Sequence, residues 1–272
     1  MSLTIQVFAN TDKGRKYENN EDSVFAFVRP EELGTAMAFI IVADGIGGHS
    51  AGEVASDLVI ETMRATLEHV LETDEQEATQ PITLEHIATD DDPFLDYLEK
   101  KLVGAIQAAN STIFDYAQSH PDNAGNLGST VTCAIIWNAT AVIANVGDSR
   151  TYLLREGDLE RITTDHSYVA ELVARGAVDE SAFFTHPQRN VITRALGHQS
   201  EVSVDTYRQV LQEGDRLLCC SDGLWEMITN PKELAALLAE DSSLEDISVT
   251  LIEAANNYGG KDNIGVSIAQ IS

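Results

Sequence analysis

Hydrophobic positions along the chain form two kinds of run, short ones typical of strands and longer ones with helical spacing. Strand-like runs occur at residues 4–10, 23–28, 37–43, 129–137, 141–146, 149–155, 159–162, 202–209, 216–220 and 264–270. Helical spacing marks four stretches, residues 51–72, 93–119, 231–240 and 244–258. The strands come in groups, with two long helices early in the chain and two late. This grouping predicts a mixed α/β domain of sheets with packed helices, not a strict strand–helix alternation.

Local signals place some element ends. Pro93 and Pro231 stand where the first turn of a helix tolerates proline. The sequence EGD at residues 156–158 predicts a hairpin turn between two strands.

Two segments lack a regular pattern. Residues 72–93 hold eight acidic residues with little periodicity, which predicts a solvated loop between two helices. Residues 165–199 are interrupted by Gly176, Pro187 and Gly197 and contain short helical pieces. We expect this second segment to form a flap between two strands.

Four apolar runs border turns in which an aspartate stands among small residues. The runs IIVADGIGG, IANVGDSR and LLCCSDG end at Asp44, Asp148 and Asp222, and GGKDN at Asp262 precedes IGVSIAQI. A strand end holds a side chain at a fixed point, and glycine lets the backbone approach a ligand. Carboxylates crowded without a cation repel by about 4 kcal/mol per pair at 4 Å and an effective dielectric near 20. Oxygen-rich clusters suit Mg²⁺ or Mn²⁺, so the pattern predicts a metal site assembled from distant parts of the chain.

Each turn also has a simpler interpretation. Asp44 fits a strand-to-helix turn with an N-cap, and Gly45-x-Gly47-x-x-Ser50 resembles a dinucleotide-binding fingerprint. The fingerprint is weak because its third glycine is missing and an aspartate precedes the first, where it would repel a pyrophosphate. Plain turns also account for Asp148, Asp222 and Asp262, and a solvated loop accounts for the NNED run at residues 19–22.

Charge limits the class of partner. The 272 residues are 43% hydrophobic and carry a formal net charge of −27. That charge argues against nucleic acid or an anionic membrane surface as the main partner. An anionic substrate is also disfavoured unless bound cations reverse the local sign.

Other features predict a soluble cytoplasmic protein. No apolar run approaches the 18 or so residues that span a membrane, and the N-terminus lacks a signal-peptide pattern. No membrane anchor is expected after the last strand. Cys133, Cys219 and Cys220 lie in apolar runs, which favours buried reduced thiols and a reducing compartment.

Eight motifs that follow one another along the chain resemble those of a known family. They are TDKGRKYENNEDS, IIVADGIGGHSAGE, LGSTVTCAII, ANVGDSRTYLL, TTDHS, HPQRNVITRALG, EGDRLLCCSDGLWEMI and GGKDNIGV. In this order they are similar to the metal-dependent type 2C (PPM) serine/threonine protein phosphatases in their compact bacterial form, over essentially the whole chain. The resemblance implies an α+β fold, a four-layer αββα sandwich with helices flanking two antiparallel sheets and a binuclear metal site at one edge. It implies one catalytic domain over residues 1–272, with a flap at about 165–199.

The resemblance assigns metal ligands residue by residue. It implies that Asp44 bridges two metals, that Gly45 offers its carbonyl, and that Asp222 and Asp262 complete the first metal. Asn263 would support its neighbour Asp262.

Three further acids match positions near the family's metals. By resemblance, Glu21 and Asp22 act mainly through metal-bound waters, with Glu21 closest to the second metal. Asp148 matches a residue that helps to hold a third, weaker ion. His49 matches a histidine that contacts substrate or donates a proton, and the alternative is a surface residue at a helix start.

The chain departs from the family at the phosphate-binding position. The family commonly has an arginine five residues before Asp22, and here that residue is Tyr17. Arg15 or Lys16 would then substitute, although lysine offers a point charge in place of a planar fork. Phosphate binding would consequently depend more on the metals.

The implied activity is hydrolysis of phosphoserine and phosphothreonine in proteins by attack of a metal-bridging hydroxide, which needs no serine, cysteine or histidine nucleophile. The implied cofactors are Mn²⁺ or Mg²⁺, two ions in the core site and a third beside them. The implied partners are phosphoproteins that a serine/threonine kinase produces, and the expected state is a monomer. Two alternatives stay open: a weakly active pseudophosphatase that serves as a binding module, and a nucleotide-binding oxidoreductase.

Overall fold

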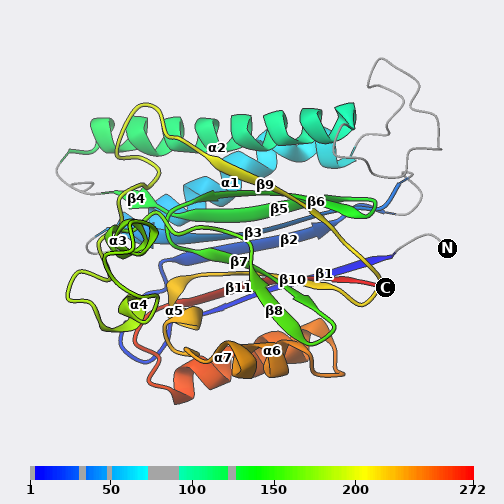
Figure 1. Cartoon of the computed structure of the whole chain (residues 1–272). Helices are drawn as coiled ribbons and strands as arrows, with labels where there is room; N and C mark the ends of the chain where they lie inside the picture. Colours follow the sequence, from blue (N-terminus) through cyan, green and yellow to red (C-terminus); the bar gives the residue numbers. More distant parts are fainter. Residues whose placement is uncertain (1–3, 31–34, 48–50, 73–91, 122–126) are drawn as a thin grey trace.

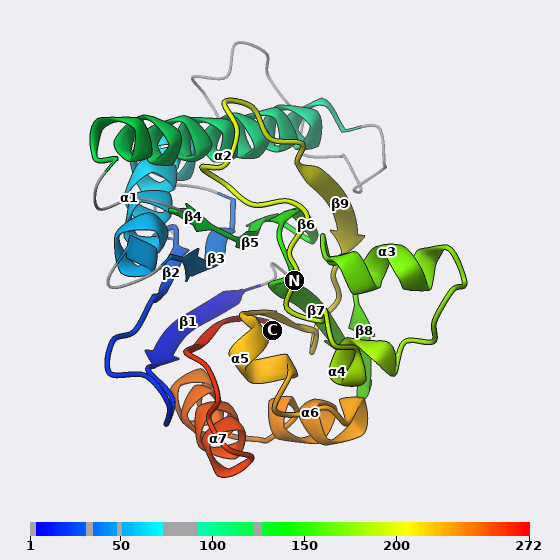
Figure 2. The ribbon, with the colours of Figure 1, turned by 90° about the vertical axis from the view of Figure 1, so that its left-hand side faces the viewer.

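The computed structural model describes residues 4–30, 35–47, 51–72, 92–121 and 127–272. Its strands form two antiparallel sheets that lie face to face, and helices cover the outer face of each sheet (Figure 1). Figure 2 shows the same arrangement from the end of the sandwich. The predicted four-layer αββα architecture is confirmed.

Each sheet is built from strands that are distant in sequence. The first sheet has the order β1 (Ile5–Asp12), β11 (Ile264–Ile271), β10 (Arg216–Cys220), β7 (Arg150–Arg155) and β8 (Asp158–Arg161). The second has the order β2 (Asp22–Val28), β3 (Met37–Ile46), β5 (Val131–Trp137), β6 (Thr140–Val146) and β9 (Asp205–Val210), with β4 (Gly128–Ser129) paired to β3.

Two helices cover each outer face. α1 (Ala51–Glu72) and α2 (Pro93–Ser119) pack on the second sheet, and α6 (Pro231–Leu238) and α7 (Leu244–Asn257) pack on the first. Pro93 and Pro231 both lie in the first turn of their helices, as predicted. Three shorter helices are α3 (Tyr168–Ala174), α4 (Ala182–Thr185) and α5 (Asp222–Trp225).

Strand β3 shows why its sequence is a continuous apolar run. Phe39 and Ile41 face the helices α1 and α2, whereas Ile40 and Val42 face the opposite sheet. Because successive side chains of a strand point to opposite faces, a strand buried on both faces needs apolar residues at every position.

Most predicted elements are confirmed, with ends that shift by a few residues. The EGD hairpin is confirmed: β7 and β8 are joined by Glu156 and Gly157, which have positive φ angles of 52° and 87°. The prediction missed β4 and α5, and β9 begins at Asp205 instead of residue 202. Residues 73–91, nearly all of the predicted acidic loop, lie outside the described part of the chain.

Strand pairing brings the aspartate turns to one end of the sandwich. In the second sheet Asp22 lies opposite Asp44. In the first sheet Cys220, the last residue of β10, lies opposite Val266 near the start of β11 and opposite Arg150 at the start of β7. The turns that contain Asp148, Asp222 and Asp262 therefore meet at the same end.

Candidate functional site

Five aspartates from five separate segments converge at this end of the sandwich. Asp22 and Asp44 come from β2 and β3, Asp148 lies between β6 and β7, Asp222 opens α5, and Asp262 precedes β11. The charges of Asp22, Asp148, Asp222 and Asp262 all act on Asp44. The structure thus brings together the four aspartates of the turn motifs and Asp22, which the family resemblance also predicts near them.

The site favours the protonated form of its carboxyl groups. Removal from water, together with neighbouring charges, raises the pKa of Asp22 and of Asp148 to about 7. Burial and the Asp22 carboxylate raise the pKa of Asp44 well above its ordinary value. Burial and Asp148 do the same to the pKa of Asp222. A bound cation would relieve the same repulsion that protons relieve here.

A buried serine fixes Asp22. The Ser221 hydroxyl donates to Asp22 Oδ2 at 2.6 Å and accepts from the Gly265 N–H at 2.8 Å. Ser221 directly precedes Asp222, so it connects the acid of β2 to the end of β10 across the two sheets. No pattern in the sequence distinguishes Ser221 from an ordinary turn residue.

Asn263 supports a different residue from the one expected. Its side-chain oxygen accepts from the Glu21 N–H at 2.8 Å, and its amide donates to Lys13 O at 2.9 Å and to Asn19 O at 3.0 Å. Only its backbone N–H contacts Asp262, through a 2.9 Å bond to Oδ1. The side chain therefore anchors the loop between β1 and β2, and with it the backbone of Glu21.

Glycines let three segments close around Glu21 and Gly45. A Cβ on Gly52 would lie 2.4 Å from Glu21 Oε2 and 2.7 Å from the Gly45 carbonyl oxygen. A Cβ on Gly45 would lie 2.0 Å from the Gly52 carbonyl oxygen. Only glycine at both positions allows the carboxylate of Glu21 and the carbonyl of Gly45 to approach one point.

An aromatic platform holds the Asp148 turn. Trp225 Nε1 donates to the Asp148 carbonyl at 3.1 Å. The guanidinium of Arg150 lies 3.5 Å from the centre of the Trp225 ring and makes hydrogen bonds of 2.9 and 2.6 Å to both oxygens of Asp165. Arg150 therefore fastens the start of the 165–199 segment to the site, a contact for which the sequence offers only the adjacent GDSR motif.

The oxygen atoms of the aspartates, Glu21 and the Gly45 carbonyl form a set of ligands that suits hard divalent cations. All of its ligating atoms are oxygens, and Asp148 Oδ1 is buried without a hydrogen-bond partner among the described residues. No three of these acids, within the described chain, close tightly enough to enclose an ion by themselves. The Gly45 carbonyl and water would complete the coordination, in keeping with the reluctance of Mg²⁺ to lose its waters.

Positive charge lies at the rim of the site. Burial raises the pKa of Asp262, and a hydrogen bond from Asn263 and the charges of Lys16 and Arg189 partly offset this effect. Lys16 Nζ donates to the exposed Tyr17 hydroxyl at 2.7 Å. The Arg15 backbone N–H is bound to the Gly260 carbonyl at 2.8 Å. Among the three predicted substrate-binding residues, Lys16 has a charge that acts on Asp262.

Arg189 is a second cation whose charge acts on Asp262. It forms an ion pair with Glu226, which follows α5 and whose charge also acts on Asp222. The sequence motif HPQRN contains this arginine, but its spacing gave no reason to place it near the acids. His49, the predicted substrate-contacting or proton-donating residue, lies outside the described residues.

The cysteines are excluded as nucleophiles. Cys133, Cys219 and Cys220 are free and fully buried, as predicted. Burial raises the pKa of Cys219 to about 12 and the pKa values of the other two well above the ordinary range. Thiols with such pKa values are not nucleophilic at neutral pH.

Comparisons with known proteins agree with this geometry. Residues 13–250 match the protein phosphatase 2C family. The chain is 38% identical over 260 residues to the serine/threonine phosphatase Stp of Listeria welshimeri, covering 96% of this chain and 93% of that protein. The structure of a serine/threonine phosphatase from S. agalactiae superposes with a TM-score of 0.82 at 30% identity, covering 98% of this chain and 100% of that one.

A further solved structure bears on the metals. It is the catalytic domain of the serine/threonine protein phosphatase PstP in complex with two manganese ions. It superposes with a TM-score of 0.74 at 33% identity and covers 99% of both chains. None of the described helices of the present chain is long and apolar enough to cross a membrane.

Proposed function

The chain belongs to the protein phosphatase 2C family and is a metal-dependent serine/threonine phosphatase, and we propose that the aspartate cluster is the site where it hydrolyses phosphomonoesters. The observation that carries this proposal is the convergence of five aspartates whose pKa values are raised. Such crowding of acids is unfavourable in the free protein and becomes favourable when cations bind. The intact aspartate set disfavours the pseudophosphatase alternative, and the family assignment disfavours an oxidoreductase.

We propose that two Mn²⁺ or Mg²⁺ ions occupy the cluster. Asp44 would lie between them, Asp222 and Asp262 would bind the first, and the Gly45 carbonyl would bind the second. The convergence of Glu21 and Gly45 on one point supports this second position. A third ion would use Asp148, whose unpartnered buried oxygen supports it.

The reaction needs little from the side chains except position and charge. A water oxygen forms a bond to phosphorus, the bond from phosphorus to the serine or threonine oxygen breaks, and that oxygen gains a proton. When bound, divalent cations supply positive charge to the phosphoryl oxygens and lower the pKa of water far enough that no protein nucleophile is needed. Ser221 and Asn263 hold Asp22 and Glu21 in place for this chemistry.

The substrates are phosphoproteins, and we propose that a serine/threonine kinase of the same cytoplasm produces them and that the enzyme acts as a monomer. With Tyr17 at the usual arginine position, Lys16 is the side chain we propose for phosphate binding. Its ammonium is a point charge, so the cations carry more of the binding than in relatives with an arginine.

We also propose that residues 165–199 form a flap that selects substrates on the single catalytic domain. The segment is tied to the core at both ends: His166 Nδ1 accepts from the Gly147 N–H at 3.0 Å, and the Leu196 N–H donates to Ser129 O at 2.8 Å. Between these ends, Arg189 pairs with Glu226 beside the acids. These contacts support a flap that is fixed at its base and faces the site.

A chelator-reversible assay tests the proposed function. The purified protein should hydrolyse an aryl phosphate with added Mn²⁺, lose activity with a chelator, and regain it when Mn²⁺ is returned. The same cycle should release phosphate from a phosphothreonine peptide. Activity that survives complete metal removal would contradict the proposal.

A further inference from the structure

A seam between α1 and β2 leads away from the aspartate cluster. β2 is an edge strand of its sheet, and Asp22 of the cluster is its first residue. Ser23 opens the seam, where its hydroxyl donates to Asp57 Oδ1 of α1 at 2.6 Å. Phe25 and Phe27 follow on the same face of the strand, because side chains alternate along it. Strand β2 therefore leads from the aspartate cluster to the two phenylalanines.

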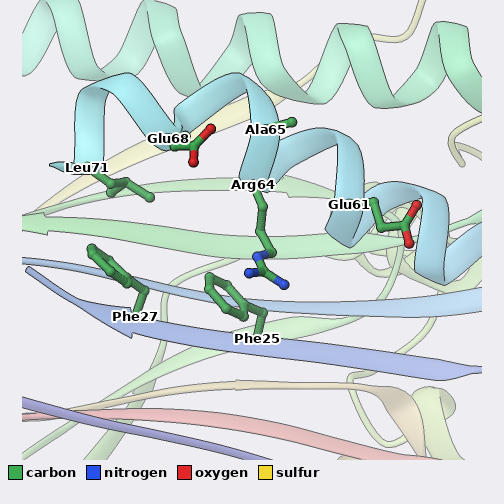
Figure 3. Close-up of a pocket in the computed structure, with 7 residues that line it drawn as sticks. All are labelled: Phe25, Phe27, Glu61, Arg64, Ala65, Glu68 and Leu71. Atoms are coloured by element: carbon green, nitrogen blue, oxygen red, sulfur yellow. The ribbon is translucent and has the colours of Figure 1, made fainter.

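The far part of this seam is open. A cavity of about 340 Å³ lies between β2 and α1. Figure 3 shows Phe25 and Phe27 on β2, with Arg64, Glu68 and Leu71 on the helix above them. We call this cavity the seam pocket, and it takes no part in the chemistry proposed above.

At the Phe25 end of the seam pocket, an aromatic ring already holds a cation that belongs to the protein itself. The Arg64 guanidinium lies 4.2 Å from the centre of the Phe25 ring. A guanidinium over an aromatic face is attracted by the ring's negative quadrupole. Within the described chain, no cation lies over the second ring, Phe27.

The Phe27 end of the seam pocket offers an acidic and an apolar side chain that suit a further cation. Glu68 is exposed on α1, and no ion pair among the described residues includes it. Leu71 supplies an apolar wall. An aromatic face, a free carboxylate and an apolar wall together suit an arginine or lysine side chain, whose stem is apolar and whose head is charged. The formal charge of −27 on the whole chain also favours a basic partner.

The distance from the aspartate cluster to Phe27 fits an extended peptide substrate. Phe27 is five residues after Asp22 along an extended strand, or about 16 Å at 3.3 Å per residue. A substrate segment that is itself extended would need about five residues to span that length. We propose that the seam pocket binds an arginine or lysine about five residues from the phosphorylated serine or threonine. The proposal rests on the proposed function, because it requires the phosphorylated residue to lie at the aspartate cluster.

Paired phosphopeptides test this proposal on the full chain. One peptide carries arginine five residues from a phosphothreonine, the other carries alanine there, and both sides of the phosphothreonine are tried. The wild-type protein should prefer the arginine peptide by about fivefold in kcat/KM, through KM. Phe27→Leu, which keeps an apolar side chain but removes the aromatic face, and Glu68→Lys should both abolish the preference. Glu213→Lys, the same charge change on an exposed turn, should retain it.

Hydrolysis of an aryl phosphate distinguishes failure of the seam-pocket proposal from failure of the proposed function. All variants should hydrolyse it like the wild-type protein. Aryl phosphate hydrolysis without any preference for the arginine peptide would overturn the seam pocket alone. Preference that persists in both Phe27→Leu and Glu68→Lys would do the same, as would a change of oligomeric state in Glu68→Lys, which would assign the pocket to a second copy of the chain. Absence of metal-dependent hydrolysis in the wild type would overturn the proposed function and this proposal with it.

Discussion

Asp22 and Asp44 lie directly opposite each other across the antiparallel strands β2 and β3, so two carboxyl groups share one end of the sheet. Asp22 is 5% exposed, and its side chain accepts a hydrogen bond from the Ser221 hydroxyl. The pKa of each is raised, chiefly by removal from water, with the other's charge contributing to the shift of Asp44. Strand pairing thus brings two buried carboxyl groups together, and their repulsion favours the binding of a proton or, as we propose, of a cation.

This arrangement predicts how the stability of the metal-free protein depends on pH. The pKa of Asp22 and of Asp148 is about 7 in the folded chain, against an ordinary value of 3.8. The folded state then binds these protons more tightly than the unfolded state. The resulting stabilisation is complete below about pH 4 and is lost as the pH rises through 7. The melting temperature of the metal-free protein should therefore fall across this window relative to that of Asp22→Asn or Asp148→Asn.

Divalent cations should remove this dependence. Mn²⁺ should raise the melting temperature by more than about 4 °C at pH 8 and by less at pH 5, since 1 kcal/mol shifts it by roughly 2–4 °C in a domain of 150–250 residues. Differential scanning calorimetry with and without a chelator measures both effects. Asp158→Asn, an exposed residue of the β7–β8 turn, should behave like the wild type. An equal gain from Mn²⁺ at both pH values would contradict the assignment.

Asp222→Asn should separate activity from stability. Loss of a carboxylate ligand should lower Mn²⁺-dependent hydrolysis of an aryl phosphate by at least about 100-fold, since residues that only orient ligands already contribute 10–100-fold. The metal-free variant should nevertheless be more stable than the wild type at pH 8, because the amide removes a charge that burial and Asp148 disfavour. Steady-state kinetics and denaturant unfolding measure the two effects. Retained activity, or lower stability, would be the contrary result.

The sequence predicted most of the strands because each strand carries its own signal, whereas their arrangement in four layers was implied only by the family resemblance. In β3, for example, burial on both faces requires the continuous apolar run that the sequence shows. The aspartate turns were equally visible, since each borders such a run. What the sequence could not show was contact across large separations in the chain. The Ser221 hydroxyl reaches Asp22 from 199 residues away, and the Asn263 side chain holds Glu21 instead of its neighbour Asp262.

Asn263→Ala should weaken metal binding without removing any ligand. The change deletes one bond to the Glu21 N–H and two to the carbonyls of Lys13 and Asn19. Loss of such supporting bonds typically lowers metal affinity by about 10–100-fold. Titration of Mn²⁺ by calorimetry should show this loss, while kcat at saturating Mn²⁺ should change much less. A variant that binds Mn²⁺ like the wild type would show that the loop between β1 and β2 does not depend on this anchor.

The ion pair between Arg189 and Glu226 gives a test of the proposed flap. The side chain of Arg189 is 31% exposed and that of Glu226 is 13% exposed, so a double-mutant cycle should give a coupling of about 0.5–1 kcal/mol in stability.

Arg189→Ala should release the middle of the 165–199 segment from the end of α5. At saturating Mn²⁺, the KM of this variant for phosphopeptides should differ several-fold from that of the wild type, because a peptide extends over the flap. The KM for an aryl phosphate should stay near the wild-type value, because so small a substrate contacts only the cluster. Arg175→Ala serves as the matched control, since Arg175 forms an exposed i,i+4 ion pair with Glu171 of α3 and has no other ion pair among the described residues. If Arg189→Ala instead raises both KM values equally, the guanidinium binds the phosphate itself, and the flap has no separate role in selecting substrates.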